Sequence, residues 1–251
     1  MSTRQMIWNS HLEGGPFFWQ AGPVGVQLCH GLTATTAEVR LLAEILHKHG
    51  YTISAPLLPG HYTRPKDLNR VTWQDWYACV SEDYNHLASR CERVIVGGES
   101  TGALLALLLA SEHPEIAAVL AYAPALKLQM SFTGEMRLRL LSLLVPHTPK
   151  TNLNSGTPWQ GYMVNPLKGV LQLLRLQRQV RKALVNIHQP VLVIQGRKDA
   201  TVHPALPVII MENIPSSVKQ SHWMESSGHV VILEQELDQV ATLTLKFLET
   251  V

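Results

Sequence analysis

Residues 93–110 constrain the fold more than any other part of the chain. Residues 93–97 carry the run Val94-Ile95-Val96 and have the character of a short buried strand, whereas residues 100–110 are apolar around nearly the whole circumference of a helix. A helix without a polar face has to be buried on every side. A strand followed by such a helix therefore belongs inside a layered domain, and 251 residues are enough to build one.

Apolar strands and amphipathic helices alternate along the rest of the chain. Thr35 and Glu38 fit a capping box at the start of the helix before Gly50. The alternation predicts the α/β class, with a doubly wound, mostly parallel sheet covered on both faces. Residues 6–8 and 17–19 are expected to form an antiparallel hairpin at one edge. Further strands are expected at 24–29, 51–56, 116–122, 191–195 and 218–223, and further helices at 72–90, 205–213 and 234–249.

A long insertion interrupts this alternation. Sixty-eight residues separate Tyr122 from Val191, far more than one crossover needs. We expect a core domain of residues 1–125 and 190–251 and a helical lid of residues 126–189, with helices at 135–145 and 165–184. The lid holds nine Lys and Arg residues but a single acidic residue. Its basic character would either draw it transiently toward anionic lipid surfaces or simply solvate its outer helix faces.

Composition excludes several classes of protein. A net charge of +2 is too small to indicate a nucleic-acid partner, and three cysteines are too few for a disulfide framework. The chain has no basic-then-apolar signal region and no stretch of eighteen apolar residues, so we expect a soluble, cytoplasmic protein. Metal-binding and phosphate-binding motifs are missing, so we expect neither a metal nor another cofactor.

The turn between residues 97 and 103 carries the first chemical motif. It reads Gly98-Glu99-Ser100-Thr101-Gly102, which is G-x-S-x-G between a strand and a helix. In that setting the turn is sharp and strained, and the serine hydroxyl projects above the sheet as a nucleophile. The alternative is a glycine-rich turn with an N-capping serine.

A serine nucleophile needs a base and a carboxylate that orients the base. Asp199 is the only aspartate between Ser100 and a later histidine, and it follows the strand expected at 191–195. A turn-forming role is the alternative. Three histidines come after Asp199. His203 is too close to it and His222 lies within an expected strand, whereas His229 lies in a loop between a strand and a helix. We therefore favour His229 as the base.

Two backbone N–H groups could bind an oxyanion next to the serine. One is that of Thr101, at the expected helix start. The other is that of Leu32, in the loop after the first parallel strand, which reads His30-Gly31-Leu32-Thr33. Gly31 allows a close turn there, and we expect the His30 side chain to brace the loop through hydrogen bonds.

Together these residues resemble the α/β-hydrolase fold family. Within it the chain is most similar to the bacterial carboxylesterase and monoacylglycerol lipase group of small lidded esterases. The resemblance covers nearly the whole chain and is weakest in the lid. It implies a serine esterase with the triad Ser100, Asp199 and His229, and with Leu32 and Thr101 as the oxyanion hole. The segments that carry it are Cys29-His30-Gly31-Leu32-Thr33, Ala55-Pro56-Leu57-Leu58-Pro59-Gly60-His61, Thr72-Trp73-Gln74-Asp75-Trp76, the Ser100 turn, the Asp199 loop and Gly228-His229.

The chain departs from that group at several positions. Position 32 is often Phe but is Leu here, Glu99 replaces an apolar residue, and Tyr62 stands where the group often has Gly. Glu99 would either hydrogen-bond within the site and stabilise the imidazolium, or bond nearby backbone. The leucines of the lid could fix it to the body or line a pocket for a medium-chain acyl group. The expected substrate contacts are Glu99, Tyr62, Leu141, Trp159, Tyr162 and Leu171.

Ester hydrolysis is the leading hypothesis. Hydrolysis of a C–C bond or a thioester, or acyl transfer, would use the same triad and stays open, because function belongs to the site rather than to the fold. A binding module without activity would need a broken triad. The partner expected is a small-molecule ester, and the sequence is silent on the oligomeric state.

Overall fold

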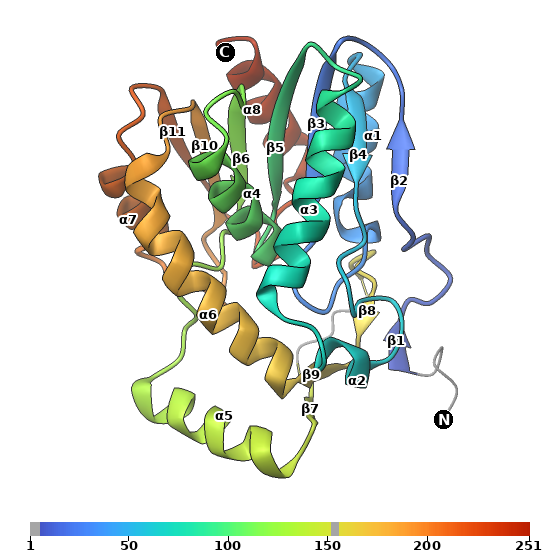
Figure 1. Ribbon diagram of the computed structural model, residues 1–251, viewed down its shortest axis with the longest axis vertical. Coiled ribbons are helices and arrows are strands. Elements are labelled where there is room, and N and C mark those ends of the chain that lie inside the picture. Colours follow the sequence, from blue (N-terminus) through green and yellow to red (C-terminus); the bar gives the residue numbers. More distant parts are fainter. Residues whose placement is uncertain (1–5, 152–155) are drawn as a thin grey trace.

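A seven-stranded sheet forms the centre of the computed structural model, which describes residues 6–151 and 156–251 (Figure 1). The strand order is β11-β10-β6-β5-β3-β4-β2, with β2 antiparallel to β4 and every other pair parallel. This is the mostly parallel α/β sheet predicted from the sequence. The strands are β2 (Phe17–Trp19), β3 (Val24–Cys29), β4 (Thr52–Ala55), β5 (Arg93–Glu99), β6 (Ala118–Tyr122), β10 (Val191–Gly196) and β11 (Lys219–Met224).

Strand β5 lies where the connections of the sheet change direction. Its neighbour β3 continues to β4 on one side, and its neighbour β6 continues to β10 on the other. In open α/β sheets the crevice at such a switch point, beyond the carboxyl ends of the strands, is where ligands bind. Ser100 follows β5 directly and His30 follows β3 directly, so both lie at this crevice.

Helices cover the sheet on both faces (Figure 1). Successive side chains of a strand point to opposite faces: Val26 and Leu28 of β3 pack with α1 and α8, whereas Cys29 packs with the helices of the other face. One face carries α1 (Ala37–Lys48) and α8 (Leu237–Leu248). The other carries α3 (Trp73–Ala88), α4 (Thr101–Glu112), α6 (Leu167–Ala183) and α7 (Leu206–Asn213).

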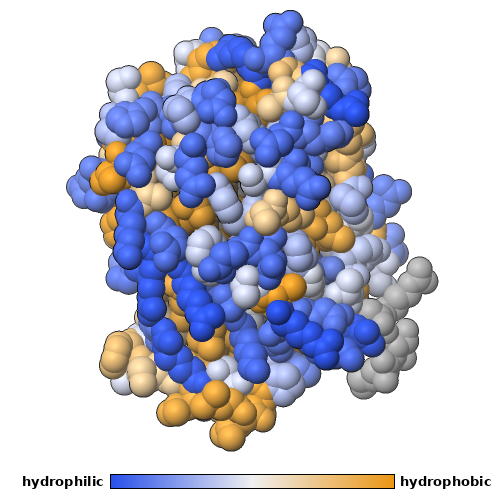
Figure 2. Space-filling view, in the orientation of Figure 1, coloured by the Kyte–Doolittle hydropathy of each residue, from blue (hydrophilic) through white to orange (hydrophobic). Residues whose placement is uncertain are grey.

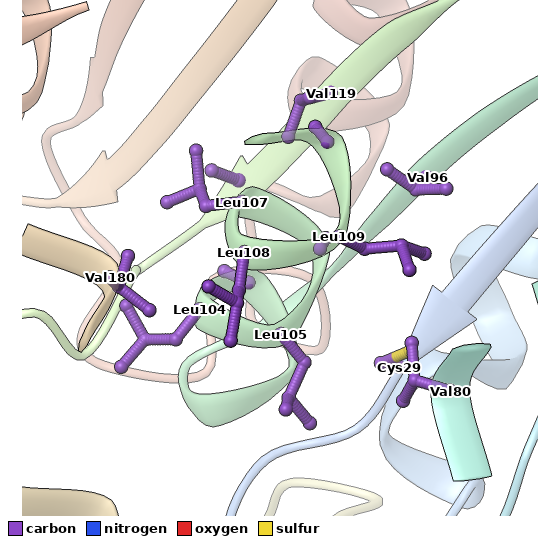
Figure 3. Close-up of a cluster of buried hydrophobic side chains, with 14 of the residues drawn as sticks. Cys29, Val80, Val96, Leu104, Leu105, Leu107, Leu108, Leu109, Val119 and Val180 are labelled. Atoms are coloured by element: carbon purple, nitrogen blue, oxygen red, sulfur yellow. The ribbon is translucent and has the colours of Figure 1, made fainter. Parts of the chain in front are cut away.

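Helix α4 is buried as the sequence predicts, because every residue from Thr101 to Ala110 is buried. Its leucines radiate in different directions (Figure 3): the labelled side chains around them include Val180 of α6 and Val119 of β6. The helix that starts at Ser100 is therefore held in place by packing all round, which fixes the position of the turn before it.

The predicted N-terminal hairpin is wrong. Strand β1 (Ile7–Trp8) pairs with β8 (Gly161–Tyr162) and not with β2, which pairs with β4 at the edge of the sheet. The Gln160 amide donates to the carbonyl oxygens of Asn9 and Leu12, which ties the segment after β1 to the insertion. Strand character alone does not reveal which partner a short strand takes.

The predicted capping box at α1 is also wrong. The N-cap is Thr36, and its side chain makes no capping hydrogen bond. The Thr35 hydroxyl donates to the Gln160 side chain, and the Glu38 carboxylate accepts from the Gly31 N–H instead. Both residues therefore have tertiary partners in place of the capping box, although the Thr35 hydroxyl also accepts from the Ala37 N–H at 3.3 Å.

The residues between β6 and β10 form α5 (Phe132–Leu144), α6 and the short strands β7 (His147–Pro149), β8 and β9 (Val164–Pro166). Their two helices lie near the positions predicted. Helix α6 packs on the body, but α5 buries only Ser142 (Figure 1). Packing of leucines on the body is therefore right for α6 and wrong for α5.

The structure also contains a short helix, α2 (Pro65–Leu68), that the sequence pattern did not indicate. None of the helices in the described residues has the length and apolar character that crossing a membrane requires.

Candidate active site

Ser100 lies in a strained turn between β5 and α4. Its φ is 56°, in the left-handed region that residues other than glycine seldom adopt. A methyl group on either Gly98 or Gly102 would clash with the Cys29 carbonyl oxygen, so only glycine lets the turn pass so close to β3. The Ser100 N–H donates to the Tyr122 carbonyl at 2.9 Å, which holds the strained residue in place.

A continuous chain of hydrogen bonds joins the three residues singled out from the sequence. Ser100 Oγ lies 2.9 Å from His229 Nε2, and His229 Nδ1 lies 2.7 Å from Asp199 Oδ2. The three side chains come from the ends of β5, β10 and β11, which are separated along the chain but meet at one edge of the sheet. The geometry is that of a nucleophile, a base and an orienting carboxylate.

Asp199 is held by more donors than His229 alone. Its Oδ1 accepts from the N–H groups of Thr201 and Val202, and its Oδ2 also accepts from the Gln195 amide at 2.6 Å. Burial alone would raise the pKa of Asp199, but the bond and charge of His229 and the two backbone donors hold this pKa below its ordinary value. The carboxylate is thus ionised and fixed in orientation. Gln195 was not predicted to be a site residue. Its position could have indicated this role, because it is an amide at the end of an apolar strand, four residues before the aspartate.

Two further carboxylates shape the loop that carries His229. Glu234 accepts from the N–H groups of Gly228 and Val230, and Glu236 accepts from the Ser227 hydroxyl. The backbone on both sides of His229 is therefore tied to the segment that leads into α8. The side chain of His229 keeps 20% of its surface exposed, so it can reach both the serine and a substrate.

The two expected oxyanion donors belong to chain segments that are next to Ser100. The N–H groups of Leu32 and Thr101 make no hydrogen bond to another described residue, and that of Thr101 is at the N-terminus of α4, where backbone donors have no partner in the helix. A methyl group on Gly31 would lie 3.3 Å from Ser100 Cβ, so the loop that contains Leu32 runs against the serine.

His30 braces that loop, as the sequence predicts. Its Nε2 accepts from the Leu58 N–H at 3.1 Å, so the ring proton is on Nδ1, which donates to the Gly31 carbonyl at 2.9 Å. Burial lowers the pKa of His30 to about 4. The ring is therefore neutral at physiological pH, and its two hydrogen bonds hold the loop in place.

Glu38 and Lys150 also reach this loop, although neither was predicted to be a site residue: Glu38 was expected only to cap a helix, and Lys150 was not singled out. Glu38 accepts from the Gly31 N–H at 2.5 Å and from Trp159 Nε1 at 2.9 Å. Lys150 donates to the Thr33 hydroxyl at 2.5 Å. Burial raises the pKa of Glu38 against the lowering effect of these donors, and burial lowers the pKa of Lys150 to about 7. Contacts this distant along the chain leave no local pattern.

Glu99 is fully buried, and among the described residues neither of its carboxyl oxygens has a hydrogen-bond partner of ordinary geometry. The expected hydrogen bond within the site is therefore not present, whereas the Ile232 backbone, a partner of the second kind expected, is close enough to lower the pKa of the carboxyl. Burial raises the pKa of Glu99 well above its ordinary value, and the negative charges of Glu38, Asp199 and Glu234 raise it further. Burial and these charges therefore favour the neutral form of this carboxyl group, which is next to the nucleophile along the chain.

The other expected substrate contacts are spread out. Tyr162 is buried, and its hydroxyl bonds the Thr63 N–H and the Gly60 carbonyl, which makes it part of the framework. Trp159 bonds Glu38, and Tyr62 is exposed on a loop with a φ of 54°. Leu141 lines a shallow groove formed by α5 itself, and Leu171 is half-buried on α6. Of these residues, Trp159 is linked to the loop that contains Leu32, because it donates to Glu38, which accepts from the Gly31 N–H.

Comparisons with known proteins give relatives that are named as lipases and esterases. The chain is 35% identical over 237 residues to the thermostable monoacylglycerol lipase of Bacillus sp. (strain H-257), covering 92% of this chain and 93% of that protein. It is 30% identical over 238 residues to a carboxylesterase of Bacillus subtilis (strain 168), covering 93% and 96%. A solved structure from work on two metagenome-derived lipolytic enzymes, LipS and LipT, superposes with a TM-score of 0.88. Its sequence is 26% identical, and the match covers 95% of this chain and 98% of that one.

A family model also matches residues 24–236, from the first parallel strand to the segment before α8. That range includes the serine turn, the aspartate loop and the histidine loop. The chain therefore has the α/β-hydrolase fold and belongs to the hydrolase family described as serine aminopeptidase, S33.

Proposed function

We propose that the protein cleaves short- to medium-chain carboxylic esters, monoacylglycerols among them, through an acyl-enzyme on Ser100. That it is a carboxylic ester hydrolase acting on small molecules follows from its family and from relatives named monoacylglycerol lipase and carboxylesterase. The observation that carries the assignment of the site is the hydrogen-bonded chain from Asp199 through His229 to Ser100.

In the proposed reaction His229 Nε2 removes the proton from Ser100 Oγ as the oxygen attacks the ester carbonyl carbon. Asp199 keeps the proton of the imidazole on Nδ1 and stabilises the imidazolium that forms. The N–H groups of Leu32 and Thr101 bind the oxyanion of the tetrahedral intermediate. The imidazolium then protonates the departing alcohol, and the acyl group stays on the serine.

The second half of the reaction repeats these roles with water. His229 deprotonates a water molecule that attacks the acyl carbon, the same two N–H groups bind the second oxyanion, and the acid leaves as Ser100 recovers its proton. The relatives' names favour esters over the C–C bonds, thioesters or acyl transfer that the same triad could serve.

We further propose that residues 126–189 form a helical lid on a core of residues 1–125 and 190–251, with the basic lid making transient contact with lipid surfaces. A cytoplasmic location stays a prediction; the free thiols of Cys29, Cys79 and Cys91 are consistent with it.

The experiment is hydrolysis of p-nitrophenyl esters from acetate to palmitate, followed by 1-monoacylglycerols of the preferred chain length, by the parent and by Ser100→Ala. We expect activity to peak at short or medium chains and kcat to fall by at least about 10³-fold in the variant. Ser111→Ala, in the same helix but bonded only to the Leu108 carbonyl, is the matched control. Full activity in Ser100→Ala would remove Ser100 as the nucleophile, and inactivity of the parent on every ester would overturn the proposed substrate class.

A further inference from the structure

The loop that carries the Leu32 N–H does not hold its shape by local bonds alone. Thr33 has a φ of 69°, in the left-handed region that is unfavourable for a β-branched residue. The one turn bond within the loop joins the Ala34 N–H to the Gly31 carbonyl at 3.2 Å. Such a conformation persists only where the surroundings enforce it.

Two ionisable side chains contribute to that enforcement, one on each side of Leu32, together with the Tyr162 N–H, which donates to the Thr33 carbonyl at 2.9 Å. Glu38, from the first turn of α1, accepts from the N–H of Gly31 at 2.5 Å. Lys150, which directly follows β7 in the insertion, donates to the hydroxyl of Thr33 at 2.5 Å. The two residues bonded in this way are the immediate neighbours of Leu32.

Trp159 joins the two charged groups to each other. Its Nε1 donates to the second carboxylate oxygen of Glu38 at 2.9 Å, and the Lys150 ammonium lies 4.1 Å from the centre of its ring. The contacts form a closed circuit from Gly31 through Glu38, Trp159 and Lys150 to Thr33. Two of its members come from the insertion and the rest from the core.

The circuit also touches the serine. A methyl group on Gly31 would lie 3.1 Å from Glu38 Oε2 and 3.3 Å from Ser100 Cβ, so Gly31 lies next to both the carboxylate and the nucleophile. A carboxylate that holds the N–H of residue 31 fixes the peptide plane between residues 30 and 31, which adjoins the plane that carries the Leu32 N–H. An oxyanion donor is effective only within a few tenths of an ångström of its ideal position.

We infer that Glu38 and Lys150 are positioning residues of the oxyanion hole, and that Trp159 and Lys150 make ester hydrolysis depend on the docking of the insertion against the loop. The inference rests on the proposed function, since it assigns Leu32 as an oxyanion donor. Neither residue touches the reacting atoms; both act through the neighbours of Leu32.

The test compares Glu38→Ala and Lys150→Met with the parent, using p-nitrophenyl butyrate. A donor that is displaced from its position stabilises the transition state less, but substrate binding in the ground state is unchanged. We therefore expect kcat to fall by about 10- to 100-fold in each variant, with KM changing less than about threefold. The inhibition constant of an alkyl boronic acid, which adds to the serine and presents an oxyanion, should rise by the same factor as kcat falls. Glu44→Gln, on the exposed face of α1, is the matched control.

A rescue separates positioning from mere stability. In Glu38→Gln the amide oxygen can accept one N–H, but the amide nitrogen would face a second donor, so kcat should fall. Combining Glu38→Gln with Trp159→Phe removes that second donor and should recover part of kcat. Loss of folded protein would not produce this recovery, and active-site titration with a fluorophosphonate gives the fraction of competent enzyme.

The outcomes are distinguishable. If Ser100→Ala is inactive while Glu38→Ala and Lys150→Met both keep kcat within threefold of the parent, the inference is overturned and the proposed function stands. If Ser100→Ala keeps its activity, the proposed function itself fails. Where Glu38→Ala does not fold, Lys150→Met tests the circuit from its other end, and an unchanged kcat there overturns the inference equally.

Discussion

Helices α5 and α6 both belong to the insertion and both are rich in leucine, yet they meet opposite environments. On α6, Leu173 and Leu176 are buried in the main core, and the arginines and lysines lie on the other side of the helix. On α5, Leu143 and Leu144 are 79% and 80% exposed. The apolar area at the foot of the space-filling view lies where Figure 1 draws α5 (Figure 2).

The difference lies in which face of each helix meets the body rather than in leucine content. Apolar residues of α6 recur on one face, and that face packs against the core. Helix α5 also has an apolar face, but the residues on it are exposed: Phe132, Met136, Leu140, Leu143 and Leu144. Its contact with α6 includes Glu135 instead, which bonds Arg178. Leucine content and periodicity predict an amphipathic helix, but they do not predict whether its apolar face docks.

The largest expected effect comes from the core of α6. Leu176 is fully buried, so Leu176→Ala should lower the free energy of unfolding by about 2–5 kcal/mol, through lost burial and the cavity left behind. Urea denaturation followed by tryptophan fluorescence measures it. A loss below about 1 kcal/mol would mean that α6 is no better anchored than α5.

The second effect concerns the pH dependence of stability. The pKa of Lys150 is about 7 in the folded protein and near 10.5 in an unfolded chain. Between these values the unfolded state binds more protons, so the contribution of Lys150 to stability rises with pH from 7 to 10.5 and is lost as pH falls to 7. Lys150→Met should therefore flatten this rise in a series of denaturation curves, whereas exposed Lys168→Met on α6 should keep the parent's slope. An identical slope in parent and Lys150→Met would contradict the burial of this charge.

A smaller effect is expected where α5 meets α6. Arg178 of α6 lies 3.3 Å from Glu135 of α5, and both side chains are partly exposed. Arg178→Ala should cost about 0–1 kcal/mol of global stability. Amide exchange should nevertheless speed up in α5 and stay unchanged in α6, as measured by mass spectrometry. Equal acceleration in both helices would show that they open as one unit.

The smallest effect is expected on the exposed face of α5. Leu143→Gln should change the free energy of unfolding by no more than about 0.5 kcal/mol, because the side chain is already in water. The same denaturation assay as for Leu176→Ala makes the two values directly comparable. A cost above 2 kcal/mol would place Leu143 against the body of the protein in solution.

Local pattern predicted most of the fold. The strand and helix positions of the sheet follow from runs such as Val94-Ile95-Val96, because burial on both faces leaves a continuous apolar signal. The residues of the triad were named from motif and chain order, and the structure brings Ser100, Asp199 and His229 into hydrogen-bond contact.

What could not be predicted depends on contacts distant along the chain. Glu38 suited a local capping box, but its partner Trp159 lies 121 positions away, and that of Lys150, Thr33, lies 117 positions away. Ile7 had strand character, but pairing with Tyr162 is decided by the packing of the insertion. A single sequence carries no signal for such pairs.

The hydrogen bonds of His30 limit how protons can move through this site. The ring of His61 lies 4.9 Å from that of His30 and donates from Nδ1 to backbone carbonyls. Protonating His30 would break its bond from Leu58, and burial lowers the pKa of His61 well below its ordinary value. Although several imidazoles lie near the sheet edge, among the described residues His229 alone joins serine to carboxylate. A pH–rate profile should therefore show no proton relay through the rings of His30 and His61.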